Sequence, residues 1–337
     1  MRILATALLS LAAASSAAAL PFSDLYFFGD SLTDTGNVTE VYATVPHPVG
    51  APATIPGAPY DPEGRASNGI VYADVLAAGL GFSALASERG GNNYAFGGAR
   101  TRYQLFGPPF LGILDQVASF RAEPGAADPN ALYVVWGGSN NLQDLFLGRT
   151  VDPLGQPIPG LGASIGDIGA ALTGLYAEGA RHLLVPNVAN LGRVPRVHEL
   201  GGPPAQAAAT GLVQAYNQGL DAMLDSFQAG HPDVHLVRFD AFAALEAIVA
   251  NAPAHGLVNL TDRCYTGDDL GFTGGGTVCA NPDEYLFWDG IHPTAATHRL
   301  LGQAMLTAVP EPSTVALTAL GLLLLAAAAR RRRHSVG

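Results

Sequence analysis

An apolar run that ends abruptly at Gly29-Asp30-Ser31 constrains this chain more than any other stretch. The run from Leu25 to Phe28 is short and bounded by a turn, which predicts a buried strand. The residues after Ser31 suit the start of a helix. Ser31 is therefore expected in a turn at the carboxyl end of a strand, where open α/β sheets place their chemistry. A serine hydroxyl in that position becomes a nucleophile only with a base and an oxyanion site.

Strand-like and helical segments alternate along the rest of the chain. Further strands are predicted at 92–96, 131–136, 182–188 and 234–239, and helices at 70–80, 111–121, 164–177, 206–229, 242–250 and 294–306. This alternation predicts an α/β domain, with a mostly parallel sheet and helices on both of its faces. Ser164 is expected to cap its helix. The Pro- and Gly-rich segment 45–63 is expected to be a surface loop, and the chain before Trp288 another loop.

A histidine and an aspartate near the end of the chain offer the chemistry that Ser31 lacks. Asp289 precedes His292 by three residues, just before the last predicted helix. A neutral imidazole can take the serine proton and return it to a leaving group. Asp289 would hold that imidazole in the correct tautomer. The alternatives are ordinary turn roles, with Ser31 as a helix cap and Asp289 as a turn-forming aspartate.

Four short motifs, in order along the chain, carry a resemblance to a known family. They are Gly-Asp-Ser-Leu at 29–32, Gly-Gly-Ala at 97–99, Gly-Ser-Asn at 138–140 and Asp-Gly-Ile-His at 289–292. Together they resemble the GDSL (SGNH) serine hydrolases, nearest to the lipase/esterase branch. The resemblance implies a three-layer α/β sandwich of flavodoxin-like type. It also implies ester hydrolysis through an acyl-serine intermediate, without a cofactor or a metal.

The same resemblance implies which groups would stabilise the oxyanion. They are the backbone N–H groups of Ser31 and Gly98 and the side-chain amide of Asn140. The sequence leaves open which glycine of the Gly97-Gly98 pair donates, although the family pattern favours Gly98. Asn141 departs from the family pattern, in which aspartate is common at this position. This difference is expected to affect the loop that holds Asn140, without removing the Asn140 amide.

Both ends of the chain predict export. Residues 1–19 combine Arg2, an apolar stretch and a small-residue cleavage site, as in a secretory signal peptide. Segment 309–337 combines Pro310-Glu311-Pro312, the apolar run 314–329 and an arginine tail, and it resembles the PEP-CTERM sorting signal of Gram-negative bacteria. The hydrolase domain is thus expected at 20–308. It would face outward, at the cell surface, in the outer envelope or outside the cell.

The resemblance at the C-terminal end implies processing by an exosortase-type membrane enzyme after transient membrane anchoring. The apolar run 314–329 would span about 24 Å as a helix, less than a hydrocarbon core of about 30 Å. Snorkelling arginines at 330–333 would make up part of that difference. The alternative is a plain C-terminal transmembrane anchor that is not removed.

The two cysteines of the chain predict a disulfide. Cys264 and Cys279 are the only cysteines, and an even pair in an exported chain is typical of a disulfide, with two free buried thiols as the alternative.

The charge of the chain bears on its possible partners. The chain has 17 basic residues against 28 acidic ones and a net charge of −11. Such a charge argues against nucleic acid as a partner.

The expected substrate is an acyl ester, whether a lipid, a short-chain ester or an acetylated glycan. The motif residues act at the ester carbonyl, so they do not indicate which acyl group or which alcohol the substrate carries. Two alternatives remain open at this point. One is an acyltransferase that uses the same triad, and the other is a surface or matrix protein that binds glycan or lipid without turnover.

Overall fold

The computed structural model describes residues 22–309, apart from 48–50, 105–106, 124, 126 and 153. The signal peptide predicted at 1–19 lies outside these residues, as does the sorting signal predicted at 309–337 except for its first residue. In the part of the chain that is described, no helix is long and apolar enough to cross a membrane. The apolar run 314–329 is not in that part.

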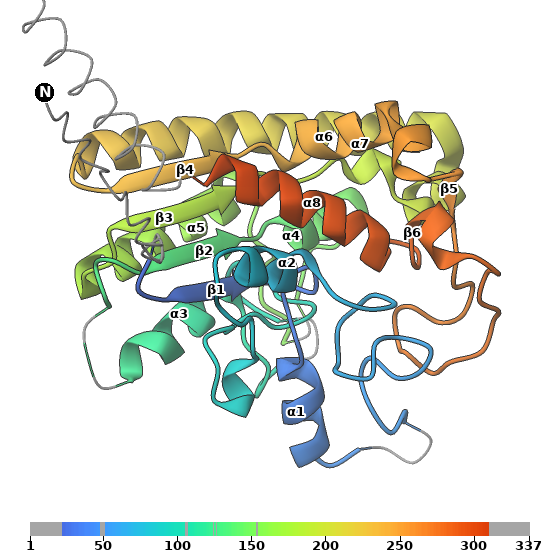
Figure 1. Ribbon diagram of the computed structural model, residues 1–337, viewed down its shortest axis with the longest axis horizontal. Helices are drawn as coiled ribbons and strands as arrows, with labels where there is room; N and C mark the ends of the chain where they lie inside the picture. Colours follow the sequence, from blue (N-terminus) through green and yellow to red (C-terminus); the bar gives the residue numbers. More distant parts are fainter. Residues whose placement is uncertain are drawn as a thin grey trace, which may run out of the picture. The chain divides into compact units, whose positions relative to one another are not determined.

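A parallel sheet of four strands forms the centre of the domain (Figure 1). The strands β1 (Leu25–Gly29), β2 (Leu132–Trp136), β3 (His182–Pro186) and β4 (His235–Phe239) lie in this order. The helices are α1 (Asn37–Thr44), α2 (Tyr72–Gly79), α3 (Ile113–Ala122), α4 (Ser139–Phe146), α5 (Leu161–Glu178), α6 (Pro195–Gly230), α7 (Ala241–Ala250) and α8 (Ala295–Ala308). The predicted α/β class and the parallel sheet are therefore confirmed.

Helices cover both faces of the sheet because alternate residues of each strand point to opposite sides. Phe28 and Val135 join one core with α3, α5 and most of α6. Phe27 and Val134, their neighbours in sequence, join a second core with α2, α7 and α8. The result is the expected arrangement of three layers.

The segment 92–96, predicted as a strand, is not one. It lies along β1 on the side away from β2, where the N–H of Tyr94 donates to the carbonyl of Phe27 at 2.8 Å. Only one parallel bridge, Phe27 with Asn93, forms there. The pairing does not continue, because the N–H of Gly29, which would donate to the carbonyl of Tyr94, donates to Gln116 Oε1 instead at 2.8 Å.

Three helix starts differ from the prediction. No helix follows Ser31 directly, and α1 begins only at Asn37, after a turn. Helix α5 begins at Leu161, so Ser164 lies inside it and donates to the Leu161 carbonyl instead of capping the helix. Helix α6 begins at Pro195, well before the predicted 206, and it is kinked at Gly201–Gly202.

The chain before Trp288, predicted as loop, contains a small second sheet. Strands β5 (Asn259–Arg263) and β6 (Tyr285–Phe287) pair there in parallel, and β6 leads directly into the Asp289–His292 segment. Both strands are short, so their sequence pattern is weak.

A buried histidine on α8 makes the stability of this fold depend on pH. His298 is 1% exposed, and its Nδ1 accepts the backbone N–H of Tyr72 at 3.3 Å. Burial, and then the nearby charge of His292, lower the pKa of His298 to about 3. The unfolded chain takes up a proton near pH 6.5 but the folded chain does not, so stability falls as pH falls through that value.

We expect His298→Asn to remove this dependence. Between pH 7 and pH 5, the unfolding free energy of the native protein should fall by about 2 kcal/mol because of His298. The asparagine variant should not show this loss. Urea unfolding of both proteins at the two pH values measures the difference. An equal loss in both proteins would show that other groups cause the pH dependence.

Candidate active site

The turn after β1 is fixed by close packing around Gly29. Gln116, from α3, accepts the N–H of Gly29 through Oε1 and donates to its carbonyl through Nε2, both at 2.8 Å. A Cβ atom at position 29 would lie 2.6 Å from Thr33 Oγ1 and 2.8 Å from the carbonyl of Trp136. Only glycine fits this close approach, and the turn that follows carries Ser31.

Asp30 is buried beside the Ser31 backbone. Its Oδ1 accepts the N–H of Leu32 at 3.0 Å, which shapes the turn. Burial raises the pKa of Asp30 to about 6, against the lowering effects of the Leu32 hydrogen bond and the charge of His292. The side chain therefore supports the turn and changes its charge in the mildly acidic range.

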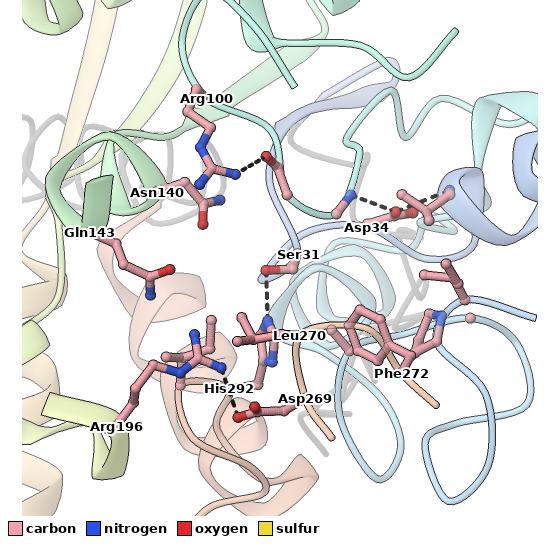
Figure 2. A pocket seen from close by; sticks show the side chains of 18 residues that line it. Ser31, Asp34, Arg100, Asn140, Gln143, Arg196, Asp269, Leu270, Phe272 and His292 are labelled. Carbon is pink, nitrogen blue, oxygen red and sulfur yellow. Dashed lines mark hydrogen bonds and ion pairs between the residues drawn. The ribbon is translucent and has the colours of Figure 1, made fainter. Parts of the chain in front are cut away.

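The structure brings together the three residues that the sequence singles out as a triad. His292 Nε2 lies 2.8 Å from Ser31 Oγ (Figure 2). On the other side of the ring, His292 Nδ1 lies 2.7 Å from Asp289 Oδ2. The Ser31–His292 contact joins positions 261 residues apart in the sequence. This is the geometry of a nucleophile, a base and an orienting acid.

Asp289 is completely buried and accepts four hydrogen bonds. Its Oδ1 accepts the N–H groups of Ile291 and His292, at 2.8 and 2.7 Å. Its Oδ2 accepts from the Tyr60 hydroxyl at 2.7 Å as well as facing His292 Nδ1. Burial opposes the charge most strongly, but the charge of His292 and the hydrogen bonds from His292 and Ile291 together outweigh burial and lower the pKa of Asp289.

The backbone hydrogen bonds distinguish the two glycines of the Gly97-Gly98 pair. The N–H of Gly97 donates to Asp34 Oδ2 at 2.8 Å and is therefore engaged. The N–H groups of Ser31 and Gly98 have no hydrogen-bond partner among the described residues. Asn140 Nδ2 donates one of its two hydrogens to the carbonyl of Ala99, at 2.9 Å, and the second hydrogen remains available to a ligand. The donors that the family resemblance implies are thus the groups left open to a ligand.

Asn141 and a buried ion pair hold the two donor segments together. Asn141 Oδ1 accepts the N–H of Thr101 at 3.0 Å, which ties α4 to the loop after Gly98. Arg100 forms two 2.8 Å hydrogen bonds with Asp144 of α4, and its Nη1 donates to the Gly98 carbonyl. Nothing in the motifs points to Arg100, although both it and Asp144 are nearly completely buried.

A cleft of about 600 Å³ opens at Ser31 and His292. One wall is mainly apolar and includes Ile55, Leu270 and Phe272. Gln143, on α4, and Arg196 line the cleft elsewhere (Figure 2). Segment 45–63, expected on the surface, instead contributes the buried residues Ile55 and Tyr60 to the site region. Its proline and glycine content concealed that role.

Cys264 and Cys279 form a disulfide in the structure, and the loop between them carries Leu270 and Phe272 into the cleft. The same loop carries Asp269, whose Oδ2 accepts the N–H of Gly290 at 2.7 Å. The disulfide-closed loop therefore touches both the cleft and the Asp289–His292 segment. In the described part of the chain, no group of three or more His, Cys, Asp or Glu residues is placed to hold a metal ion.

Comparison with known proteins places the chain in a family. The model of the GDSL-like lipase/acylhydrolases matches residues 25–305. The chain belongs to this family. It is a carboxylic ester hydrolase, as the four motifs predict. The model of the PEP-CTERM protein-sorting motif matches residues 308–333, which confirms the resemblance at the C-terminal end.

Two relatives match most of this GDSL hydrolase. Acetylajmalan esterase 2 of Rauvolfia serpentina is 26% identical over 85% of this chain and 90% of its own length. An acetylesterase of Thermothelomyces thermophilus is 28% identical over 90% of this chain and 96% of its own length. Among solved structures, a member of the lipolytic G-D-S-L family from Veillonella parvula has a TM-score of 0.42. It is 12% identical and covers 84% of this chain and 96% of its own.

The ion pair beside the oxyanion donors gives a test of how the site is held. We expect Arg100→Leu to destabilise the protein by about 2–3 kcal/mol, because Asp144 loses its buried two-bond partner and keeps only the half-exposed Arg149 and the Tyr103 hydroxyl. The double variant Arg100→Leu/Asp144→Leu should recover much of that loss, since it leaves no buried charge alone. Urea unfolding measures both. A double variant no more stable than Arg100→Leu would contradict this explanation.

Proposed function

We propose that this chain is an exported serine esterase that works through an acyl-Ser31 intermediate, with Asp289 and His292 completing a catalytic triad. The observation that carries the proposal is the 2.8 Å contact between Ser31 Oγ and His292 Nε2. Beside it lie N–H groups, on Ser31 and Gly98, that have no partner among the described residues. A nucleophile activated by a base and facing open donors is what acyl transfer requires.

In the first half of the reaction, Ser31 Oγ attacks the ester carbonyl carbon while His292 Nε2 takes the hydroxyl proton. Negative charge moves to the carbonyl oxygen, which the N–H groups of Ser31 and Gly98 and the Asn140 amide stabilise. The bond to the alcohol oxygen then breaks, and His292 gives that oxygen the proton. The acyl group stays on Ser31 as an ester.

In the second half, water replaces the alcohol. His292 takes a proton from the water as the water oxygen attacks the acyl carbon, and Ser31 leaves with that proton to regenerate its hydroxyl. Asp289 holds the imidazole throughout without taking up the proton itself. Its lowered pKa is consistent with that constant charge.

The substrate we propose is a carboxylic ester with a short acyl group. The two relatives reported above are named for acetyl esters, which supports short chains first. A second cleft of about 630 Å³ also reaches Ser31 and His292, and its apolar lining includes Trp136, Leu191 and Leu245. An ester could thus place one arm in each cleft.

We also propose that the enzyme is exported by a signal peptide at 1–19 and processed near Pro310-Glu311-Pro312 by an exosortase-type enzyme. The match of the sorting-motif model to residues 308–333 supports this proposal. The domain that would be released to the surface or the outside of the cell spans 20–308.

The nucleophile is tested by comparing the native protein with Ser31→Ala on p-nitrophenyl esters from acetate to palmitate. We expect turnover in the native protein, highest on short chains, and none above background in the variant. A serine-directed phosphonate should add its mass to Ser31 in the native protein only. Equal activity of the two proteins would mean that another serine is the nucleophile. Added glycerol would reveal acyl transfer as a glycerol ester product.

Asn140→Ala tests the oxyanion site. We expect kcat on p-nitrophenyl acetate to fall about 10²–10³-fold with little change in KM, because the donor acts on charge that develops in the transition state. Asn251→Ala is the control, because it removes an exposed side-chain amide at the end of α7 that lines neither cleft. Similar losses in both variants would contradict the role given to Asn140.

A further inference from the structure

Tyr60 makes a contact with the proposed triad that no motif indicates. Its side chain is 6% exposed, and its hydroxyl donates to Asp289 Oδ2 at 2.7 Å. The two residues are 229 positions apart in the sequence. Because burial and the neighbouring charge of Asp289 raise the pKa of Tyr60, the phenol keeps its proton and remains a donor.

The contact matters because of which oxygen receives it. Asp289 Oδ1 is taken by two backbone N–H groups, those of Ile291 and His292. Oδ2 is left to two side chains, the imidazole of His292 and the phenol of Tyr60, each at 2.7 Å. A donor on that oxygen draws negative charge away from the imidazole. It also fixes the plane of the carboxylate.

Aromatic packing holds the phenol in place. The Tyr60 ring meets Tyr265, Phe272 and Trp288 edge to face, with ring centroids 5.5, 5.2 and 6.1 Å apart. Tyr265 directly follows Cys264, and Phe272 lies within the disulfide-closed loop. The loop that contributes a cleft wall therefore also seats Tyr60 against Asp289.

We infer that Tyr60 is a positioning residue of this enzyme. Its O–H fixes the Asp289 carboxylate and limits the negative charge that Asp289 presents to His292. The inference rests on the proposed triad. Other ionisable groups face the same residues: Asp30 of the Ser31 turn, His298 of α8, Asp269 and Tyr265 of the disulfide-closed loop, Arg263 of β5 and Arg196 of α6. Tyr60→Phe leaves all of them unchanged, and the control variant described next changes only Tyr265.

The test compares two tyrosines of one cluster. Tyr60→Phe removes the hydroxyl that reaches Asp289 and keeps the ring. Tyr265→Phe is the matched control, because the Tyr265 hydroxyl is buried and has no hydrogen-bond partner in the described part of the chain. Both variants remove one oxygen atom from the same aromatic cluster, so a purely structural effect would be similar in both.

We expect the acid limb of the pH profile of kcat/KM, measured on p-nitrophenyl acetate with full-length protein, to move to higher pH by roughly half a unit to one unit in Tyr60→Phe. Tyr265→Phe should keep the native profile. An unshifted limb in Tyr60→Phe, or equal shifts in both variants, would overturn the inference.

A second measurement does not need turnover. The proton shared by His292 Nδ1 and Asp289 should give a far-downfield NMR signal, assigned by its loss in Asp289→Ala. We expect this signal to change position in Tyr60→Phe and to stay in place in Tyr265→Phe. If the native protein hydrolyses no ester but the signal changes as expected, the proposed function fails while the role of Tyr60 stands. An unchanged signal overturns that role even if the esterase activity is present.

Discussion

The carboxylate of Asp34 connects the parts of this site that must not move relative to one another. It accepts the N–H groups of Gly36 and Asn37, at 2.8 and 2.7 Å, where the turn after Ser31 gives way to α1. It also accepts the N–H of Gly97, at 2.8 Å, from the loop that carries Gly98. One buried side chain thus sets the distance between the proposed nucleophile and the oxyanion donor. It also decides which of two adjacent glycines remains free.

Much of this protein could be predicted because the relevant signals are local. The strand before Ser31 is a continuous apolar run, as expected for a parallel strand buried on both faces. Asp289 and His292 lie three residues apart, so one short segment delivers both side chains. Most helices around the sheet follow from periodicity, although α4 was not predicted. The start of α1 depends instead on Asp34, whose carboxylate accepts the N–H groups of Gly36 and Asn37.

The remaining features depend on partners that are distant in sequence. Gln116 reaches Gly29 across 87 residues, and Tyr60 reaches Asp289 across 229. A glutamine in a helix and a tyrosine in a Pro- and Gly-rich segment carry no sign of such contacts. The same holds for Arg100, whose burial depends on Asp144 being opposite. Only the folded chain shows that segment 45–63 reaches into the interior.

The meeting of two clefts at Ser31 has a consequence for how molecules arrive. Ser31, Asn140, Gln143, Ile291 and His292 line both clefts, one on either side of the reacting atoms. A single cleft would hold only one arm of an ester, whereas here the acyl and alcohol arms can lie in different clefts. The bond to be cut then need not be terminal, and the two fragments can depart in different directions.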